Sequence, residues 1–247
     1  MSDSATVRAR KATIRAEALA ARRRLEPARL AEAATRVRAA LLDHLPELLR
    51  SHAGSGEPPV AASYVPVGAE PGGPDLPDVL HRALPPGCRL LLPVLRDDLD
   101  LDWAAHDHEL RPTRRGLSEP TGPRLGPQAI AEATLLVVPA LAVDRHGVRL
   151  GRGGGSYDRA LARVPSGATV VALLHDGELR QEPLPAEPHD RPVAAVVTPG
   201  SGLEWINRSR PGGEAGHAPV VRPVTRRSAR TPVPVPGGPT SAGQRAG

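Results

Sequence analysis

Five short apolar segments, rich in Val and Leu, constrain the fold of this chain more than any other feature. They cover residues 60–65, 89–95, 134–143, 168–175 and 193–198. Each is nearly continuous rather than alternating in hydropathy, which is typical of strands buried on both faces of a sheet. Segments with helical character lie between several of them, at residues 76–84, 127–132 and 157–164. This alternation predicts a three-layer, Rossmann-like α/β domain whose mostly parallel sheet has helices on both faces.

Two further helices are expected before the first strand. Residues 5–24 are mostly Ala, Arg, Leu and Glu, which favour helix, although large apolar side chains are few there. Residues 26–50 carry a leucine stripe that Pro46 interrupts. Residues 99–105 are expected to add an antiparallel strand to the sheet.

The composition changes after Asn207, where Pro, Gly, Arg, Ser and Thr replace any apolar periodicity. Such a segment cannot bury enough surface to offset its chain entropy. We therefore expect one catalytic domain over residues 1–207 and a disordered Pro/Gly/Arg-rich tail over residues 208–247. The formal net charge of +5 belongs to this tail, where seven arginines oppose only Glu214. A nucleic-acid partner is therefore not expected for the folded domain, and polyanion binding by the tail stays open.

The location of the protein is predicted from what the chain lacks. A run of eighteen apolar residues and an apolar N-terminal signal are both absent, so we expect a cytoplasmic protein without membrane contact. Cys88 is the single cysteine, which excludes an intramolecular disulfide and a multi-cysteine metal site. We expect a monomer.

The most informative segment is a predicted buried strand that leads into a glycine-dense loop and then a helix. The loop contains Gly151, Gly153, Gly154 and Gly155, with Arg149 and Arg152 beside them. Successive backbone N–H groups of such a loop converge on an anion, and arginines add charge-assisted bonds to phosphate oxygens. Asp158 is either a first-turn helix acid or a ligand for Mg²⁺. On spacing alone, the loop is either a phosphate site or a flexible turn.

The residues around this loop resemble the 5-formyltetrahydrofolate cyclo-ligase family. That family carries a VPALAFD-like strand, a turn ending in G-x-R-L-G-R-G-x-G-Y-Y-D-R, and a later P-x-x-x-H-D segment before a final strand. The present chain has matching segments at residues 139–144, 149–159 and 185–190, in that order. Weaker matches lie at Lys11 to Arg15, at residues 64–70 and at residues 116–120. Ser156 stands where the family has the first Tyr of Tyr-Tyr-Asp.

The resemblance implies a site for two small-molecule substrates, ATP and 5-formyltetrahydrofolate. ATP would be bound by Lys11, Arg15, Arg149, Leu150, Gly151, Arg152, Gly153, Gly154, Gly155, Ser156 and Tyr157. Among these, Arg149, Arg152 and Tyr157 would be catalytic. The folate would be bound by Val65, Glu70 and Trp103, with Trp103 either stacked on a substrate ring or buried in the core. Asp158 and Asp190 would hold Mg²⁺ as the cofactor.

The implied reaction converts 5-formyltetrahydrofolate to 5,10-methenyltetrahydrofolate and releases ADP and phosphate. ATP would phosphorylate the formyl oxygen, and N10 of the folate would then close the ring. Such a transfer requires mainly positioning and neutralisation of charge. The alternatives are another α/β ATP-utilising kinase or ligase, and a polyanion-binding protein acting through the basic tail.

Overall fold

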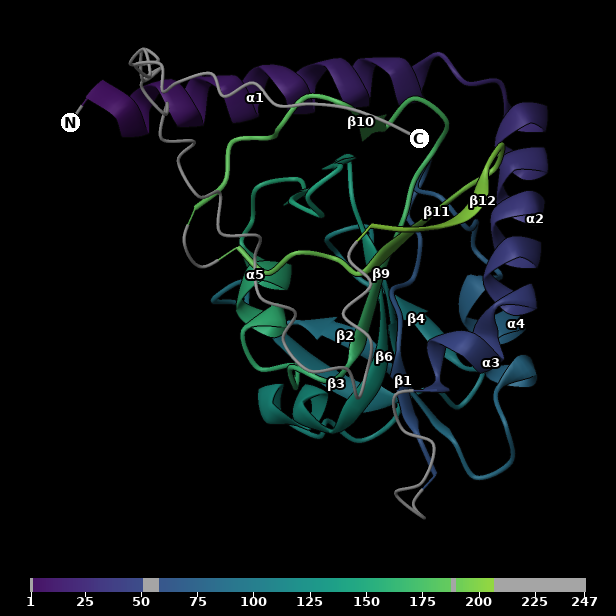
Figure 1. The fold of residues 1–247 in the computed structure, drawn as a ribbon. Coiled ribbons are helices and arrows are strands. Elements are labelled where there is room, and N and C mark those ends of the chain that lie inside the picture. Colours follow the sequence, from purple (N-terminus) through teal and green to yellow (C-terminus); the bar gives the residue numbers. More distant parts are fainter. Residues whose placement is uncertain (1, 51–57, 188–189, 207–247) are drawn as a thin grey trace, which may run out of the picture. The chain divides into compact units, whose positions relative to one another are not determined.

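The main sheet of the molecule has seven strands, in the order β12-β11-β9-β6-β1-β2-β3 (Figure 1). The computed structural model describes residues 2–50, 58–187 and 190–206. The parallel strands are β1 (Val60–Ala62), β2 (Arg89–Leu95), β6 (Ala133–Pro139), β9 (Thr169–Leu173) and β11 (Ala195–Thr198). The two edge strands, β3 (Leu101–Ala105) and β12 (Gly202–Trp205), are antiparallel to their neighbours. The predicted mostly parallel α/β sheet is therefore confirmed.

The nearly continuous apolar segments are explained by burial of the sheet on both faces. Leu135 and Val137 of β6 belong to one core cluster, whereas Leu136 and Val138 belong to another. Successive side chains of a strand point to opposite faces, so each strand supplies both clusters. Because each cluster also contains residues of covering helices, the predicted three-layer arrangement is confirmed.

Different helices cover the two faces (Figure 1). One face carries α2 (Pro27–Asp43), α3 (Leu45–Leu48) and α4 (Leu76–Ala83), and the other carries α5 (Ser156–Leu161) and the 3-10 helix η2 (Pro127–Glu132). The predicted helix over residues 26–50 is divided, because α2 ends at Asp43 and Pro46 lies in the first turn of α3. Proline lacks the N–H that a continuous helix requires at that point, but it fits a first turn.

Helix α1 (Ser2–Arg23) contacts β7 of a second, smaller sheet. That sheet has the order β10-β7-β8, formed by β10 (Leu179–Arg180), β7 (Ala142–Asp144) and β8 (Arg149–Leu150). A separate ribbon pairs β4 (Leu110–Pro112) with β5 (Ser118–Pro120). Few apolar residues hold α1, and Ile14 and Ala18 are among those buried.

Three details differ from the sequence prediction or lie beyond it. The segment predicted as one strand over residues 134–143 divides after Pro139, and Ala142 begins β7 in the smaller sheet. Residues 202–205 form β12, whose half-exposed side chains give no strand signal in the sequence. The predicted tail over residues 208–247 lies outside the described residues, so the proposed domain boundary stays a prediction.

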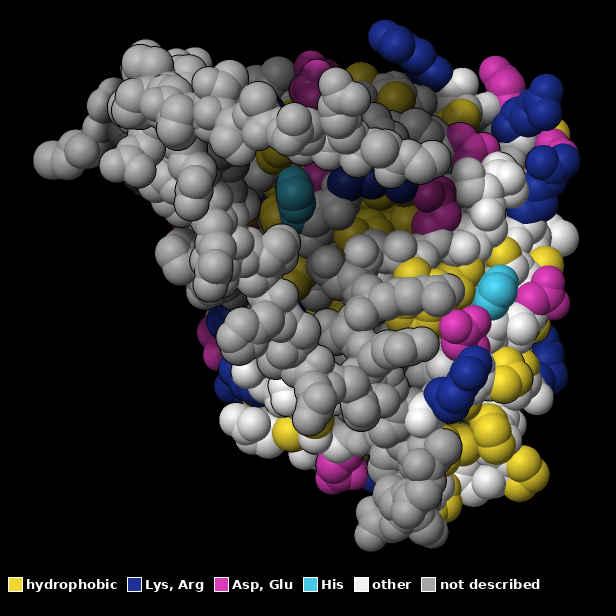
Figure 2. All heavy atoms as spheres, in the orientation of Figure 1, with side chains coloured by type: hydrophobic (Ala, Val, Ile, Leu, Met, Phe, Trp, Pro, Cys, Tyr) yellow, Lys and Arg dark blue, Asp and Glu magenta, His cyan; other side chains and the backbone are white. Residues whose placement is uncertain are grey.

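The visible surface has mixed charge. Figure 2 shows Lys and Arg side chains interspersed with Asp and Glu side chains along the edge formed by α2. On this helix Glu32 pairs with Arg29 at 3.3 Å and with Arg36 at 2.7 Å. In the part of the chain that the structure describes, no helix is long and apolar enough to cross a membrane.

Candidate functional site

A pocket of about 960 Å³ opens at the carboxyl edge of the parallel strands. Val65 and Glu70 follow β1, Leu95 ends β2, Pro139 ends β6, and residues 140–141 follow it; all of these line the pocket. Ligands of open α/β sheets bind at this edge, because the loops that leave the strands converge there. The lining contains eight Lys and Arg residues against five Asp and Glu residues, which favours an anionic ligand.

The glycine-rich loop, residues 151–155, lies between β8 and α5 and lines the pocket throughout. Gly153 and Gly155 have φ values of +101° and +72°, which side chains other than glycine rarely adopt. A Cβ on Gly153 would also lie 3.2 Å from Cζ of Arg15. Since α5 has only six residues, its dipole is small, and an anion at this loop would depend on the loop N–H groups and nearby cations.

The acid that ends the VPALAVD segment is structural. Asp144 is 1% exposed, and its Oδ1 accepts hydrogen bonds from the backbone N–H groups of His146 and Val148, both at 2.9 Å. Its Oδ2 accepts a bond from the N–H of Leu184 at 2.8 Å. These bonds fix the turn between β7 and β8, and β8 then delivers Arg149 to the pocket.

Arg149 is held rigidly beneath the pocket. Its side chain is 5% exposed, forms an ion pair with Asp158, and donates to the carbonyl of Pro139 at 3.3 Å. Its Cζ lies 5.9 Å from the ring centroid of Tyr157, within reach of a cation–π interaction. Burial lowers the pKa of Arg149 and the charge of Asp158 opposes this shift, so the guanidinium remains protonated.

Helix α1 brings two further cations into the pocket from a distant part of the sequence. Nζ of Lys11 lies 2.9 Å from Oε2 of Glu187 and 3.5 Å from Oδ2 of Asp190. Nε of Arg15 donates to the carbonyl of Gly151 at 2.9 Å. Lys11 and Arg15 therefore share the helix face that their spacing of four residues predicts.

Glu70 lies opposite the loop and contacts it through Arg152. Oε1 of Glu70 is 3.1 Å from Nε of Arg152, and Oε2 accepts a bond from the N–H of Val67 at 3.0 Å. Burial, followed by the negative charge of Glu70, raises the pKa of Tyr157 well above its usual value. The hydroxyl of Tyr157 is therefore a neutral hydrogen-bonding group at physiological pH.

Trp103 requires a correction, because the structure separates it from the other predicted site residues. It is 0% exposed in β3, packs in the core cluster beneath α5, and does not line the pocket. Strand β3 runs away from the pocket edge, so Leu101 at its start lines the pocket and Trp103 lies deeper. Trp103 is a core residue, so the structure favours the core alternative for this side chain over stacking on a substrate ring. Every other predicted site residue lines the pocket.

Sequence reasoning missed several charged residues of the lining. Arg8 lies one helical turn before Lys11, so the spacing of three residues could have placed Arg8 on the same helix face as Lys11. Arg115 and Arg159 also line the pocket, from the β4–β5 turn and from α5. Arg159 ends the family segment at residues 149–159 and could have been found there, whereas no local pattern distinguishes Arg115 from a solvated arginine. Glu187, the partner of Lys11, is likewise visible only in three dimensions.

The fold and pocket together define a three-layer α/β enzyme domain with a basic, glycine-lined pocket at the carboxyl edge of its sheet. The sequence model of the 5-formyltetrahydrofolate cyclo-ligase family matches residues 7–199. A 5-formyltetrahydrofolate cyclo-ligase of Mycolicibacterium smegmatis is 47% identical over 147 residues, which cover 57% of this chain and 74% of that relative. The chain belongs to the 5-formyltetrahydrofolate cyclo-ligase family.

Solved structures agree with this assignment. The structure of 5,10-methenyltetrahydrofolate synthetase from Aquifex aeolicus is similar with a TM-score of 0.63 and 26% identity, covering 86% of this chain and 99% of that chain. A 5,10-methenyltetrahydrofolate synthetase from Mycoplasma pneumoniae shares the fold with a TM-score of 0.56 at 16% identity, covering 75% of this chain and 96% of that one.

Proposed function

We infer that the pocket carries out the reaction of its family, the ATP-dependent conversion of 5-formyltetrahydrofolate to 5,10-methenyltetrahydrofolate with release of ADP and phosphate. One observation carries this inference. The glycine-rich loop, the two α1 cations Lys11 and Arg15, and the carboxylate of Glu70 line a single pocket in a chain of this family. The first two groups suit a triphosphate, and the third suits the N–H edge of a pterin.

The phosphate end of the pocket is assigned to the loop and to four cations. Lys11, Arg15, Arg149 and Arg152 all line it, and their charges would neutralise the charge that spreads over the transferred phosphoryl group. Arg149 is buried and held by its partners, so little reorganisation energy is needed when negative charge develops on the transferred group. The formyl oxygen receives the phosphoryl group, which turns a poor leaving group into a good one.

The folate end is assigned to Glu70 and Val65. A carboxylate accepts paired N–H donors, and the Glu70 side chain is 11% exposed, so such bonds would form away from bulk water. Ring closure then needs no nucleophile from the protein, because N10 of the folate attacks the activated formyl carbon and phosphate leaves. The pocket must hold N10 beside that carbon and exclude water.

The carboxylates in the pocket fit Mg²⁺. Asp158 and Asp190 both line it, and both act on the charge of Arg149, so they face one region. Carboxylate, water and phosphate oxygens are the ligands that Mg²⁺ prefers. We assign Asp158 and Asp190 to hold the ion with the ATP phosphates, where it would add positive charge at the transferred group.

The direct test is formation of the methenyl chromophore from 5-formyltetrahydrofolate with Mg·ATP present or omitted. We compare wild type with Asp158→Ala and Asp158→Asn, and with Asp43→Ala as a matched loss of an exposed helix acid. ATP-dependent product from wild type and Asp43→Ala, strongly reduced in both Asp158 variants, is expected. Absence of product from folded, nucleotide-binding wild type would contradict the assignment and favour another ATP-utilising enzyme.

A monomeric state, a cytoplasmic location and the absence of a nucleic-acid partner for the domain stay predictions. Interspersed charge along α2 supports the last of these. The rival role of the basic tail is tested by deleting residues 208–247, because polyanion binding through the tail would disappear and would fall steeply with salt.

A further inference from the structure

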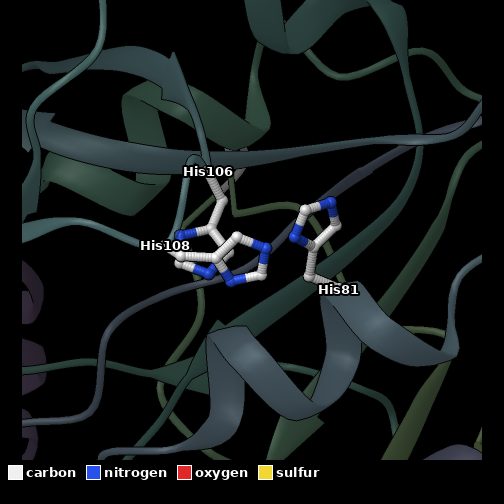
Figure 3. Close-up of side chains that lie close together, drawn as sticks. All are labelled: His81, His106 and His108. Carbon is white, nitrogen blue, oxygen red and sulfur yellow. The ribbon is translucent and has the colours of Figure 1, made fainter.

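Three histidines converge away from the pocket, between α4 and the chain that follows β3 (Figure 3). His81 belongs to α4, and His106 and His108 follow the end of β3. One ring nitrogen from each lies within 4.8 Å of the others, and the ring centroids are 4.7 to 5.3 Å apart. None of the three lines the pocket.

Asp78 orients two of these rings. Its Oδ1 lies 2.8 Å from Nε2 of His106 and 3.1 Å from Nδ1 of His108. Asp78 stands one helical turn before His81, so α4 presents both side chains on one face. A carboxylate that accepts a ring N–H fixes the tautomer and directs the lone pair of the other nitrogen outward, which is the usual support of a metal-binding histidine.

Two of the remaining ring nitrogens lack partners in the part of the chain that the structure describes. Nδ1 of His81 and Nδ1 of His106 are buried without a hydrogen-bond partner among the described residues, and the His106 side chain is only 1% exposed. A buried nitrogen without a hydrogen-bond partner destabilises the fold. A ligand that accepts the lone pairs of both nitrogens would explain why two such atoms lie in one cluster.

We propose that His81, His106 and His108 bind one divalent transition-metal ion, and that Asp78 holds two of the rings in position. Three imidazoles suit Zn²⁺ and its late first-row neighbours, whereas Mg²⁺ prefers oxygen. With bonds of about 2.0–2.1 Å, tetrahedral ligand nitrogens lie roughly 3.3 Å apart, so modest ring movement closes the site. The His108 side chain is 55% exposed, which leaves a fourth position open to water.

The site would join two elements that are distant in the sequence, because His81 lies in α4 whereas His106 and His108 follow β3. The bound ion would connect α4 to the chain that follows the edge strand β3.

The test uses untagged, full-length protein stripped with EDTA and titrated with Zn²⁺ by calorimetry in excess Mg²⁺, which occupies oxygen-rich sites. His108→Asn and His81→Gln each remove one ligand, and Asn tolerates the left-handed φ of +71° at position 108. His44→Asn is the matched control, because His44 is a half-exposed histidine outside the cluster. Asp78→Asn keeps all three ligands and removes only the carboxylate.

Wild type and His44→Asn should bind one Zn²⁺ per chain, and at 100 times the Kd the ion should raise Tm by roughly 5–10 °C. His81→Gln and His108→Asn should weaken binding at least about tenfold, and Asp78→Asn about 10–100-fold. Failure of wild type to bind one equivalent, or equal affinity in wild type and the ligand variants, would overturn the proposal. Circular dichroism confirms that each variant is folded.

Discussion

Replacing Arg22 by Met should loosen the helix that carries Lys11 and Arg15 into the pocket. Lys11, Arg15, Ala18 and Arg22 follow one another at spacings of four, three and four residues, so they share one face of α1. Arg22 is the anchor at the end of this face. It donates to both carboxylate oxygens of Glu178, at 2.7 and 2.8 Å, and also to a backbone carbonyl at 2.5 Å.

The expected cost follows from the burial of both partners. The Arg22 side chain is 4% exposed and that of Glu178 is 10% exposed. Without Arg22, the Glu178 carboxylate keeps the N–H of His175 at 2.8 Å but loses its countercharge. Removing one partner of a buried ion pair costs about 3–5 kcal/mol. Because few apolar side chains hold α1, part of this cost should appear as local opening of the helix.

Denaturant unfolding measures the global cost, and hydrogen exchange of α1 amides measures the local one. Arg23→Met is the control, since Arg23 is the exposed neighbour on the same helix. The double variant Arg22→Met/Glu178→Leu should lose less stability than Arg22→Met alone, because no buried charge remains. Weaker ATP binding should accompany the opening. Unchanged stability and unchanged exchange in Arg22→Met would refute this reasoning.

Four further predictions follow from the same geometry. Lys11→Arg should raise the KM for ATP roughly tenfold in steady-state assays, because a planar guanidinium does not fit a site that accepts an ammonium. Trp103→Phe should cost about 1–2 kcal/mol in denaturant unfolding and leave the folate KM within about twofold, since its indole N–H has no partner among the described residues and the ring lies in the core. In EDTA, the free energy of unfolding should fall as pH drops below 6.5, the ordinary pKa of His81. Burial lowers the pKa of His81 in the folded protein, so the unfolded chain binds a proton there before the folded chain does. His81→Gln should flatten this part of the pH–Tm profile. A non-hydrolysable ATP analogue should strengthen folate binding in calorimetry. Arg152 would leave Glu70 to bind phosphate, which frees the Glu70 carboxylate for the folate, so Arg152→Ala should abolish the enhancement.

Much of the fold was predictable from the sequence because burial on both faces leaves a strong local signal. Runs such as residues 89–95 and 168–175 gave strands close to those observed. The break after Pro139 was not predicted, because residues 140–143 stay apolar while the chain passes to a second sheet. Strand β12 was missed because its side chains are half-exposed and its pairing depends on β11.

The candidate site was predictable where its residues are adjacent in the sequence. The loop from Arg149 to Asp158 lines the pocket as expected. Partners were not predictable, because the pairing of Lys11 with Glu187 joins residues from opposite ends of the domain. Trp103 was misassigned because a strand position alone does not tell whether a side chain lies at the pocket edge or deeper in the core.

The pairing of opposite charges inside the pocket explains how so many charged groups remain stable in one place. Arg149 is paired with Asp158, Arg152 with Glu70, and Lys11 with two acids. An unpaired charge in a partly buried site is costly, so each group is stabilised by its neighbour while the substrates are absent. In the proposed reaction, phosphate would take the place of the acids beside the cations, Mg²⁺ would be held by Asp158 and Asp190, and the pterin edge would pair with Glu70. Binding then exchanges one set of partners for another, so the substrates should assist one another because each frees the group that the other needs.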